Sequence, residues 1–126
     1  MAKTILEPFE QSLASLNDIF VTSTSSVVLR DAIILRFQYT LENVYKYFFR
    51  TLEGQGIENL SPENIFNEFK QQNFIDDPGI WMNFVAAKNL IIQSYNDANA
   101  NEVFKIIPQF VESAEELLTK IKKNGI

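Results

Sequence analysis

The sequence predicts an all-α protein, an up-and-down bundle of about five helices that forms a single domain over residues 1–126. Apolar residues recur at spacings of three and four over long stretches, which is the period of one helix face. The chain has only four glycines and four prolines, and several stand where a helix is expected to begin or end. No alternating pattern typical of strands is present, so the helices must pack on one another.

An amphipathic first helix is predicted over residues 3–20 and a long second helix over residues 27–53. The hydroxyl-rich stretch 21–26 suits a connection that ends in a helix N-cap. The long helix carries one apolar seam, made of Ile34, Phe37, Leu41, Val44, Phe48 and Leu52. A second, partly solvated stripe comprises Arg36, Tyr39, Asn43, Lys46 and Arg50. Gly54 and Gly56 stop this helix.

Three more helices are predicted in the second half of the chain. Ser61-Pro62 and Asp77-Pro78 each combine a cap with a first-turn proline, starting helices that run to about Gln72 and Ser94. The inward seam expected for the second of these is Trp81, Val85, Lys88, Ile92 and Tyr95, with Phe84 alongside. Asn99 with Glu102 fits a capping box for a final helix to about Lys123, with a kink expected at Pro108.

The composition excludes several kinds of chemistry. The chain has no cysteine, which rules out disulfides, thiolate zinc sites and a cysteine nucleophile. It has no histidine, which rules out imidazole acid-base catalysis. A metal site would need oxygen ligands alone, and we expect neither a metal nor a cofactor.

The net charge and the apolar runs indicate where the protein works. A formal charge of −5 makes nucleic acid and anionic membranes poor partners. The apolar runs are too short to span a bilayer, and the N-terminus lacks the apolar core of a signal peptide. A soluble cytoplasmic protein is expected.

Clusters of charge have simple structural interpretations. Asp76 and Asp77 could form a carboxylate pair for metal or acid-base work, but an N-cap beside Pro78 is favoured. The acidic group Glu112, Glu115 and Glu116 is interpreted as a solvated face, and the basic group Lys120, Lys122 and Lys123 as cations favoured by the dipole at a helix C-terminus.

Aromatic residues are unusually abundant, with eleven phenylalanines in the chain. We expect some of them to cover an exposed patch that a second copy buries, which predicts a homodimer or a larger assembly.

Lys88 is the most unusual residue of the predicted fourth helix. Lys88 and Tyr95 are seven residues apart and share a helix face with Trp81. A cation on an apolar seam needs a carboxylate, an interface or a path to solvent. Spacing alone favours a Lys that extends to solvent and a core Tyr.

Three stretches of the chain together resemble the nucleotidyltransferase substrate-binding proteins, a HEPN-type helical family found beside minimal nucleotidyltransferases. Residues 31–46 resemble the family pattern D-x-x-I-x-R-F-E-F-T-x-E-x-x-W-K. Ser61-Pro62, then residues 74–77 and Trp81, resemble its S-P and L-I-D-D-x-x-x-W elements. Residues 88–96 lie where the family has R-N-x-T-S-H-x-Y. The likeness covers roughly residues 5–122.

The resemblance implies a non-catalytic, substrate-binding or regulatory partner of a small nucleotidyltransferase encoded nearby. Tyr95 matches the tyrosine that partner enzymes modify with AMP in related proteins, so it is a candidate acceptor; retention for packing alone is the other interpretation. The groove or interface candidates are Arg36, Tyr39, Glu42, Trp81, Lys88, Asn89 and Gln93.

The resemblance also implies an alternative, a ribonuclease toxin of a toxin-antitoxin pair, whose motif is degenerate here. Lys88 replaces the family Arg and lacks its bidentate fork, and Gln93 replaces the His and cannot titrate. Loss of a positioned proton-transfer group typically lowers the reaction rate about 10²–10⁴-fold. Lys88, Gln93 and Tyr95 would therefore form at most an impaired nuclease site.

Overall fold

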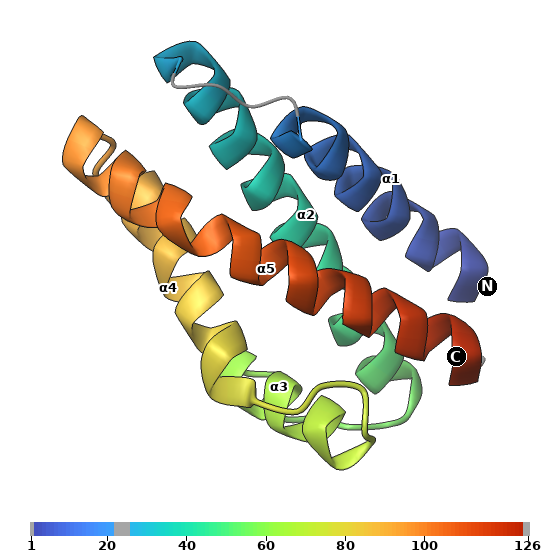
Figure 1. The fold of residues 1–126 in the computed structure, drawn as a ribbon. Helices are drawn as coiled ribbons and strands as arrows, with labels where there is room; N and C mark the ends of the chain where they lie inside the picture. The colour runs from blue at the N-terminus through green and yellow to red at the C-terminus, as the bar shows by residue number, and fades with distance from the viewer. Residues whose placement is uncertain (1, 22–25, 125–126) are drawn as a thin grey trace.

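The computed structural model describes residues 2–21 and 26–124, which form five α-helices and no strand. The helices are α1 (Ala2–Val21), α2 (Val27–Gly54), α3 (Pro62–Gln71), α4 (Pro78–Gln93) and α5 (Asp97–Asn124). The four longer helices alternate in direction, and the short α3 closes one end of the bundle (Figure 1). The N-terminus, at the start of α1, and the C-terminus, at the end of α5, lie near each other (Figure 1). The all-α, up-and-down bundle predicted from the sequence is confirmed.

Side-chain caps set three of the helix starts at the predicted residues. The Ser26 hydroxyl accepts a hydrogen bond from the backbone N–H of Leu29 at 3.3 Å, and Ser61 accepts one from Asn64 at 3.3 Å. The Asp77 carboxylate accepts one from Gly79 at 2.8 Å. These caps satisfy backbone donors that have no partner inside the helix. Asp77 is therefore a cap, as the sequence favoured.

The start of α5 differs from the prediction by one short turn. The Asn96 side chain, rather than Asn99, accepts the capping hydrogen bond, from the backbone N–H of Asn99 at 2.8 Å. Asn99 lies inside the first turn, and its side-chain amide donates to the Ser94 carbonyl at 2.7 Å. Both Asn residues suit a cap, and the pattern of Asn99 with Glu102 pointed to the wrong one. The helix continues through Pro108 to Asn124.

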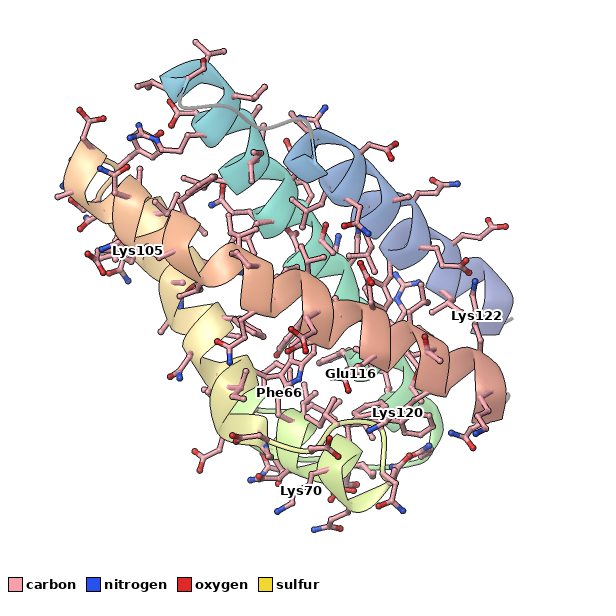
Figure 2. All side chains as sticks on the ribbon, in the orientation of Figure 1. Phe66, Lys70, Lys105, Glu116, Lys120 and Lys122 are labelled. Atoms are coloured by element: carbon pink, nitrogen blue, oxygen red, sulfur yellow. The ribbon has the colours of Figure 1, made fainter. Side chains whose placement is uncertain are left out.

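One hydrophobic core runs through the bundle and contains the whole predicted seam of α2. Its centre is aromatic: Phe48 stacks on Phe69 with ring centroids 3.7 Å apart, and Phe110 meets Phe37 edge-on at 4.9 Å. Trp81 packs against Phe84 at 5.3 Å. Phe66 lies inside the bundle, whereas Lys70 and Lys105 are exposed on its outside (Figure 2).

The structure corrects the expectation that phenylalanines cover an exposed patch. Every phenylalanine whose side chain the structure describes is buried or partly buried. The exposed large apolar residues are instead Val27, Val28, Leu35, Tyr39, Leu90, Ile92 and Tyr95. Aromatic rings in this chain fill the interior between helices, where each buries a large apolar area.

The inward face of α4 also differs from the predicted seam. Trp81, Phe84 and Ile91 are its buried residues, whereas Ile92 is 65% exposed and Tyr95, beyond the end of the helix, is 51% exposed. Most sides of α4 are apolar in sequence, so the spacing alone could not distinguish two neighbouring stripes. Packing of Trp81 and Phe84 against Phe110 selects the observed one.

Candidate functional site

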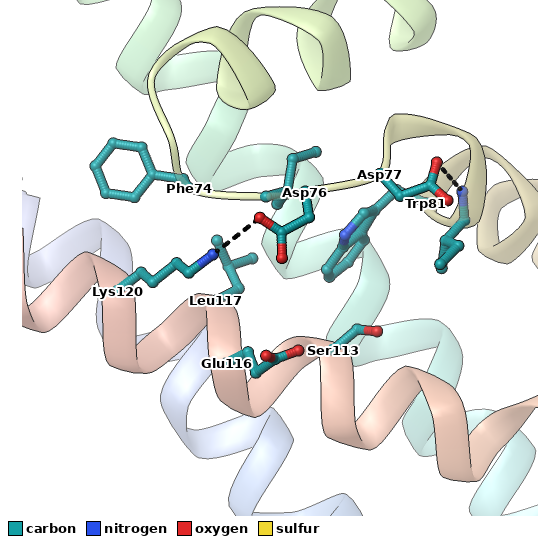
Figure 3. Close-up of a pocket in the computed structure, with 10 residues that line it drawn as sticks. Phe74, Asp76, Asp77, Trp81, Ser113, Glu116, Leu117 and Lys120 are labelled. Carbon is teal, nitrogen blue, oxygen red and sulfur yellow. Dashed lines mark hydrogen bonds and ion pairs between the residues drawn. The ribbon is translucent and has the colours of Figure 1, made fainter.

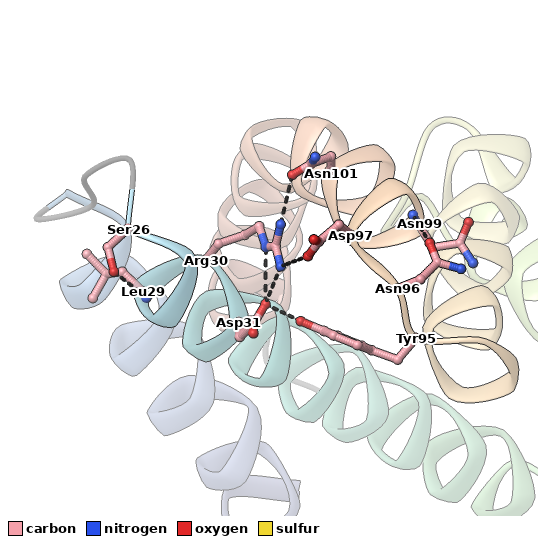
Figure 4. A network of polar contacts seen from close by, with 9 residues as sticks. All are labelled: Ser26, Leu29, Arg30, Asp31, Tyr95, Asn96, Asp97, Asn99 and Asn101. Carbon is pink, nitrogen blue, oxygen red and sulfur yellow. Dashed lines mark hydrogen bonds and ion pairs between the residues drawn. The ribbon is translucent and has the colours of Figure 1, made fainter.

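A polar cluster joins the start of α2, the connection after α4 and the start of α5. It consists of Arg30, Asp31, Tyr95, Asp97 and Asn101, and we refer to it as the Tyr95 cluster (Figure 4). Tyr95 points from the α4–α5 connection toward Asp31, and Arg30 reaches from α2 to α5 (Figure 4). Three segments distant in the sequence thus meet at one end of the bundle.

Arg30 is the centre of the Tyr95 cluster. Its Nη2 lies 3.0 Å from a carboxylate oxygen of Asp31 and 3.0 Å from one of Asp97. Its Nη1 donates to the side-chain oxygen of Asn101 at 3.1 Å. The hydrogen bond with Asp97, followed by those with Asp31 and Tyr95, raises the pKa of Arg30 above its ordinary value. Arg30 is a fixed cation that orients both carboxylates.

Tyr95 presents its hydroxyl to a carboxylate while its ring faces solvent. The hydroxyl donates a hydrogen bond to Asp31 Oδ1. The Tyr95 residue is 51% exposed and the Asp31 side chain 42% exposed, whereas the Arg30 side chain beside them is only 11% exposed. An accessible phenol with an adjacent carboxylate is an arrangement that can serve as a nucleophile with a proton acceptor.

The environment keeps the Tyr95 phenol protonated. Partial burial raises the pKa of Tyr95, and the hydrogen bond to Asp31 raises it further, while Arg30 opposes these effects. The neutral phenol is therefore the form present near neutral pH. A reaction at this oxygen requires a group that takes the proton.

Hydrogen bonds hold the short connection that carries Tyr95 on both sides of this residue. Ser94, in extended conformation, ends α4, and its backbone N–H still donates to the Leu90 carbonyl at 2.9 Å. On the other side, Asn96 caps α5 and Asn99 donates back to the Ser94 carbonyl. These bonds fix the backbone that positions the Tyr95 ring.

The remaining residues of the degenerate motif lie on α4 without bonds to the Tyr95 cluster. Lys88 is half-buried, and Asn89 and Gln93 are exposed. Within the described residues, none of the three has a hydrogen bond or an ion pair with another side chain. Lys88 has no carboxylate partner there, which agrees with a lysine that extends to solvent.

Arg36 and Tyr39 line a different feature, a groove between α1 and α2. The groove has a volume of about 210 Å³ and is also lined by Gln11, Ser12 and Ser15. Arg36 Nε donates to the Ser15 hydroxyl at 2.9 Å. Glu42, farther along α2, pairs with Lys46 at 3.7 Å.

A small hollow lies at the opposite end of α4 from Tyr95. Its volume is about 100 Å³, and its lining includes Asp76, Trp81, Glu116 and Lys120 (Figure 3). Lys120 pairs with Asp76 at 3.4 Å, and Trp81 is otherwise a core residue. Ligand pockets usually have volumes of about 300–1,000 Å³, so this hollow is too small for a nucleotide. The structure therefore separates the seven groove or interface candidates into different parts of the bundle.

The resemblance found in the sequence gives Tyr95 as a candidate but does not give the residues that contact it. Arg30, Asp97 and Asn101 were not candidates, and Asp31 entered only as the first residue of the α2 pattern. The contact between Asp31 and Tyr95 joins residues 64 positions apart. The available signal was the family pattern itself, which contains both residues.

Residues 2–21 and 26–124 contain neither a membrane-spanning helix nor a cluster of metal ligands. No helix there is both long enough and apolar enough to cross a membrane. No three acidic side chains there gather closely enough to hold a metal ion.

The fold and the Tyr95 cluster define an all-helical bundle with a polar site at one end and no imidazole or thiol in the chain. A family model described as "Nucleotidyltransferase substrate binding protein like" matches residues 4–123, and the chain belongs to this family. The resemblance found in the sequence is thus confirmed.

A solved structure has a similar fold. The chain is similar to a crystal structure of a protein from Thermus thermophilus, with 27% identity and a TM-score of 0.78. The similarity covers 90% of this chain and 98% of the Thermus chain. No curated protein matches the sequence.

Proposed function

We propose that this chain is the substrate-binding or regulatory partner subunit of a small nucleotidyltransferase and that Tyr95 receives a nucleotide from that enzyme. Family membership over residues 4–123 supports the partnership. The observation that carries the role of Tyr95 is its geometry, an exposed phenol whose hydroxyl is bonded to Asp31. The transfer chemistry belongs to the partner enzyme.

An intact-mass measurement tests this proposal. The purified chain is incubated with the nucleotidyltransferase encoded beside it, ATP and magnesium. We expect each chain to gain the mass of one AMP, because one phenol in the described part of the bundle is both exposed and paired with a carboxylate. Tyr95→Phe should abolish the gain.

Tyr39→Phe is the matched control, since Tyr39 is 55% exposed but has no carboxylate contact among the described residues. It should gain AMP like the wild type. An unchanged mass with co-elution of the two proteins would reduce the proposal to a binding subunit. If neither an adduct nor a complex formed, both parts of the proposal would be contradicted.

The same preparation tests the ribonuclease alternative. We expect the chain alone to leave RNA intact, because Gln93 cannot transfer a proton and Lys88 makes no bond within the described residues that would orient it. Cleavage that disappears in Lys88→Ala would instead favour a toxin.

We also propose that the chain forms a homodimer through an apolar stripe on α2. Val28, Leu35 and Tyr39 are exposed and are spaced by seven and four residues, so they share one helix face. Asp31 lies on the same face between Val28 and Leu35, which places the Tyr95 cluster beside the stripe. Exposed apolar stripes of this kind are typical of association surfaces.

A further inference from the structure

We propose that Asp31 is the general base that takes the proton from Tyr95 during nucleotide transfer. This inference rests on the proposed function, because it assigns a role within the same reaction.

The geometry places the carboxylate where a base must be. The Tyr95 hydroxyl donates directly to Asp31 Oδ1, so no rearrangement is needed before proton transfer. The other carboxylate of the Tyr95 cluster, Asp97, contacts Arg30 and has no bond to the phenol. Of these two acids, Asp31 alone is in hydrogen-bond contact with the reacting atom.

Arg30 restricts the position of the Asp31 carboxylate without covering it. Nε and Nη2 of Arg30 lie 3.1 and 3.0 Å from Asp31 Oδ1, and Nη1 is tied to Asn101 on α5. The covered guanidinium thus holds Oδ1, while the Asp31 side chain and the Tyr95 ring remain about half open to solvent. An enzyme that carries ATP can approach the phenol from that open side.

The proposed step is a substitution at the α-phosphorus of ATP. The Tyr95 oxygen attacks this phosphorus and forms a new O–P bond, while the bond from the phosphorus to the bridging oxygen of pyrophosphate breaks. Pyrophosphate leaves with that electron pair, and the phenolic proton moves to Asp31. The partner enzyme supplies the bound ATP and magnesium.

The raised pKa of Tyr95 agrees with the need for a base at this position. Partial burial and the bond to Asp31 both favour the protonated phenol, so little phenolate is present near neutral pH. The charged groups that interact with the phenol are Arg30 and Asp31 from α2, and Asp97 of α5 pairs with Arg30. The Asp31 carboxylate can accept the phenolic proton as the O–P bond forms.

The test compares Asp31→Asn with Asp76→Asn in the nucleotide-transfer assay. In Asp31→Asn the amide oxygen can still accept a hydrogen bond from the phenol, but the amide cannot take the phenolic proton. Proton transfer by a positioned group raises a reaction rate about 10²–10⁴-fold, so the rate of nucleotide transfer to Tyr95 should fall at least about 100-fold in Asp31→Asn. Asp76→Asn removes the same charge at an exposed aspartate outside the Tyr95 cluster, where Asp76 pairs with Lys120 at 3.4 Å, and it should retain the wild-type rate. Circular dichroism and thermal melting verify that both variants fold.

The pH profile separates proton transfer from simple positioning. In Asp31→Asn the phenol must ionise before attack, so the rate should rise about tenfold per pH unit between about pH 7 and pH 9. The wild-type rate should rise much less over this range. Equal rates and equal profiles for wild type and Asp31→Asn would overturn the role of Asp31 while leaving Tyr95 as the acceptor.

Acetylation by N-acetylimidazole tests Asp31 without the partner enzyme. We expect Tyr95, measured against Tyr39 in the same sample, to be acetylated more slowly in Asp31→Asn than in the wild type. Peptide mass spectrometry distinguishes the two sites. Absence of AMP transfer to the wild type would contradict the proposed role of Tyr95 as acceptor. An acetylation rate of Tyr95 that is the same in Asp31→Asn and in the wild type would contradict the role of Asp31.

Discussion

At the scale of single residues, neighbours in the sequence have opposite environments. Ile91 is 6% exposed and Ile92 is 65% exposed, although both belong to an almost wholly apolar part of α4. Arg30 and Asp31 likewise differ, since the guanidinium is covered and the carboxylate is open. The pair Ile91 and Ile92 allows the effect of burial on stability to be measured for one and the same side chain.

Ile91→Ala and Ile92→Ala should therefore differ strongly in stability. Ile91→Ala leaves a cavity in the core and should lower the free energy of unfolding by about 2–5 kcal/mol. Ile92→Ala should change it by less than about 0.5 kcal/mol. Urea denaturation of both variants measures the difference, and similar losses would contradict the assigned face of α4.

Alkaline pH should weaken the fold through two tyrosines. Burial raises the pKa of Tyr47, and burial together with the bond to Asp31 raises the pKa of Tyr95. The unfolded chain loses these protons near the ordinary value of about 10, before the folded chain does. The stabilisation from both groups is complete below about pH 10 and is lost as pH rises through the raised pKa values.

Unfolding measured at a series of pH values from neutral to strongly alkaline checks this expectation. A double Tyr47→Phe, Tyr95→Phe variant removes both titrations and should lose less stability across the alkaline range. An alkaline decline of equal size in the double variant would show that other groups cause it.

At the scale of elements, helix boundaries follow from local hydrogen bonding. Ser26, Ser61 and Asp77 cap three helices, and the prolines at the starts of α3 and α4 occupy positions where no backbone donor is needed. These boundaries were predictable because a cap and its partner lie within three residues. The start of α5 was predicted less well because Asn96 and Asn99 compete for the same role.

Removal of the Asp77 cap should destabilise the bundle measurably. Asp77→Ala leaves the backbone N–H of Gly79 without its side-chain acceptor and should cost about 1 kcal/mol. Asp77→Asn keeps a capping oxygen and should cost much less. Denaturant unfolding compares the two, and equal losses would indicate that Asp77 acts through its charge rather than through its hydrogen bond.

At the scale of the whole molecule, the directions of the helices create the candidate site. Because α2 runs opposite to α4 and parallel to α5, the start of α2 meets the end of α4 and the start of α5 (Figure 1). That arrangement brings Asp31 to Tyr95 and Arg30 to Asp97. It also leaves the α2 stripe of Val28, Leu35 and Tyr39 on the surface next to Tyr95.

The proposed dimer is tested by changing this stripe. Leu35→Asp places a charge in its middle and should convert a dimer into a monomer in sedimentation equilibrium, because the charge would have to be buried unpaired. Val27→Asp is the matched control, since Val27 is exposed but lies off the stripe, and it should remain dimeric. A wild-type protein that is monomeric at high concentration would contradict the proposal.

The sequence by itself determined the helical class, most helix boundaries and the buried seam of α2, because short-range hydrogen bonds and one-sided apolar spacing decide them. It also excluded imidazole and thiol chemistry, and its resemblance to the family marked Tyr95. Only the tertiary structure decided which face of α4 turns inward, where the phenylalanines lie and which carboxylate meets Tyr95. These features depend on contacts between residues far apart in the chain, such as Asp31 and Tyr95, and local patterns carry no information about such pairs.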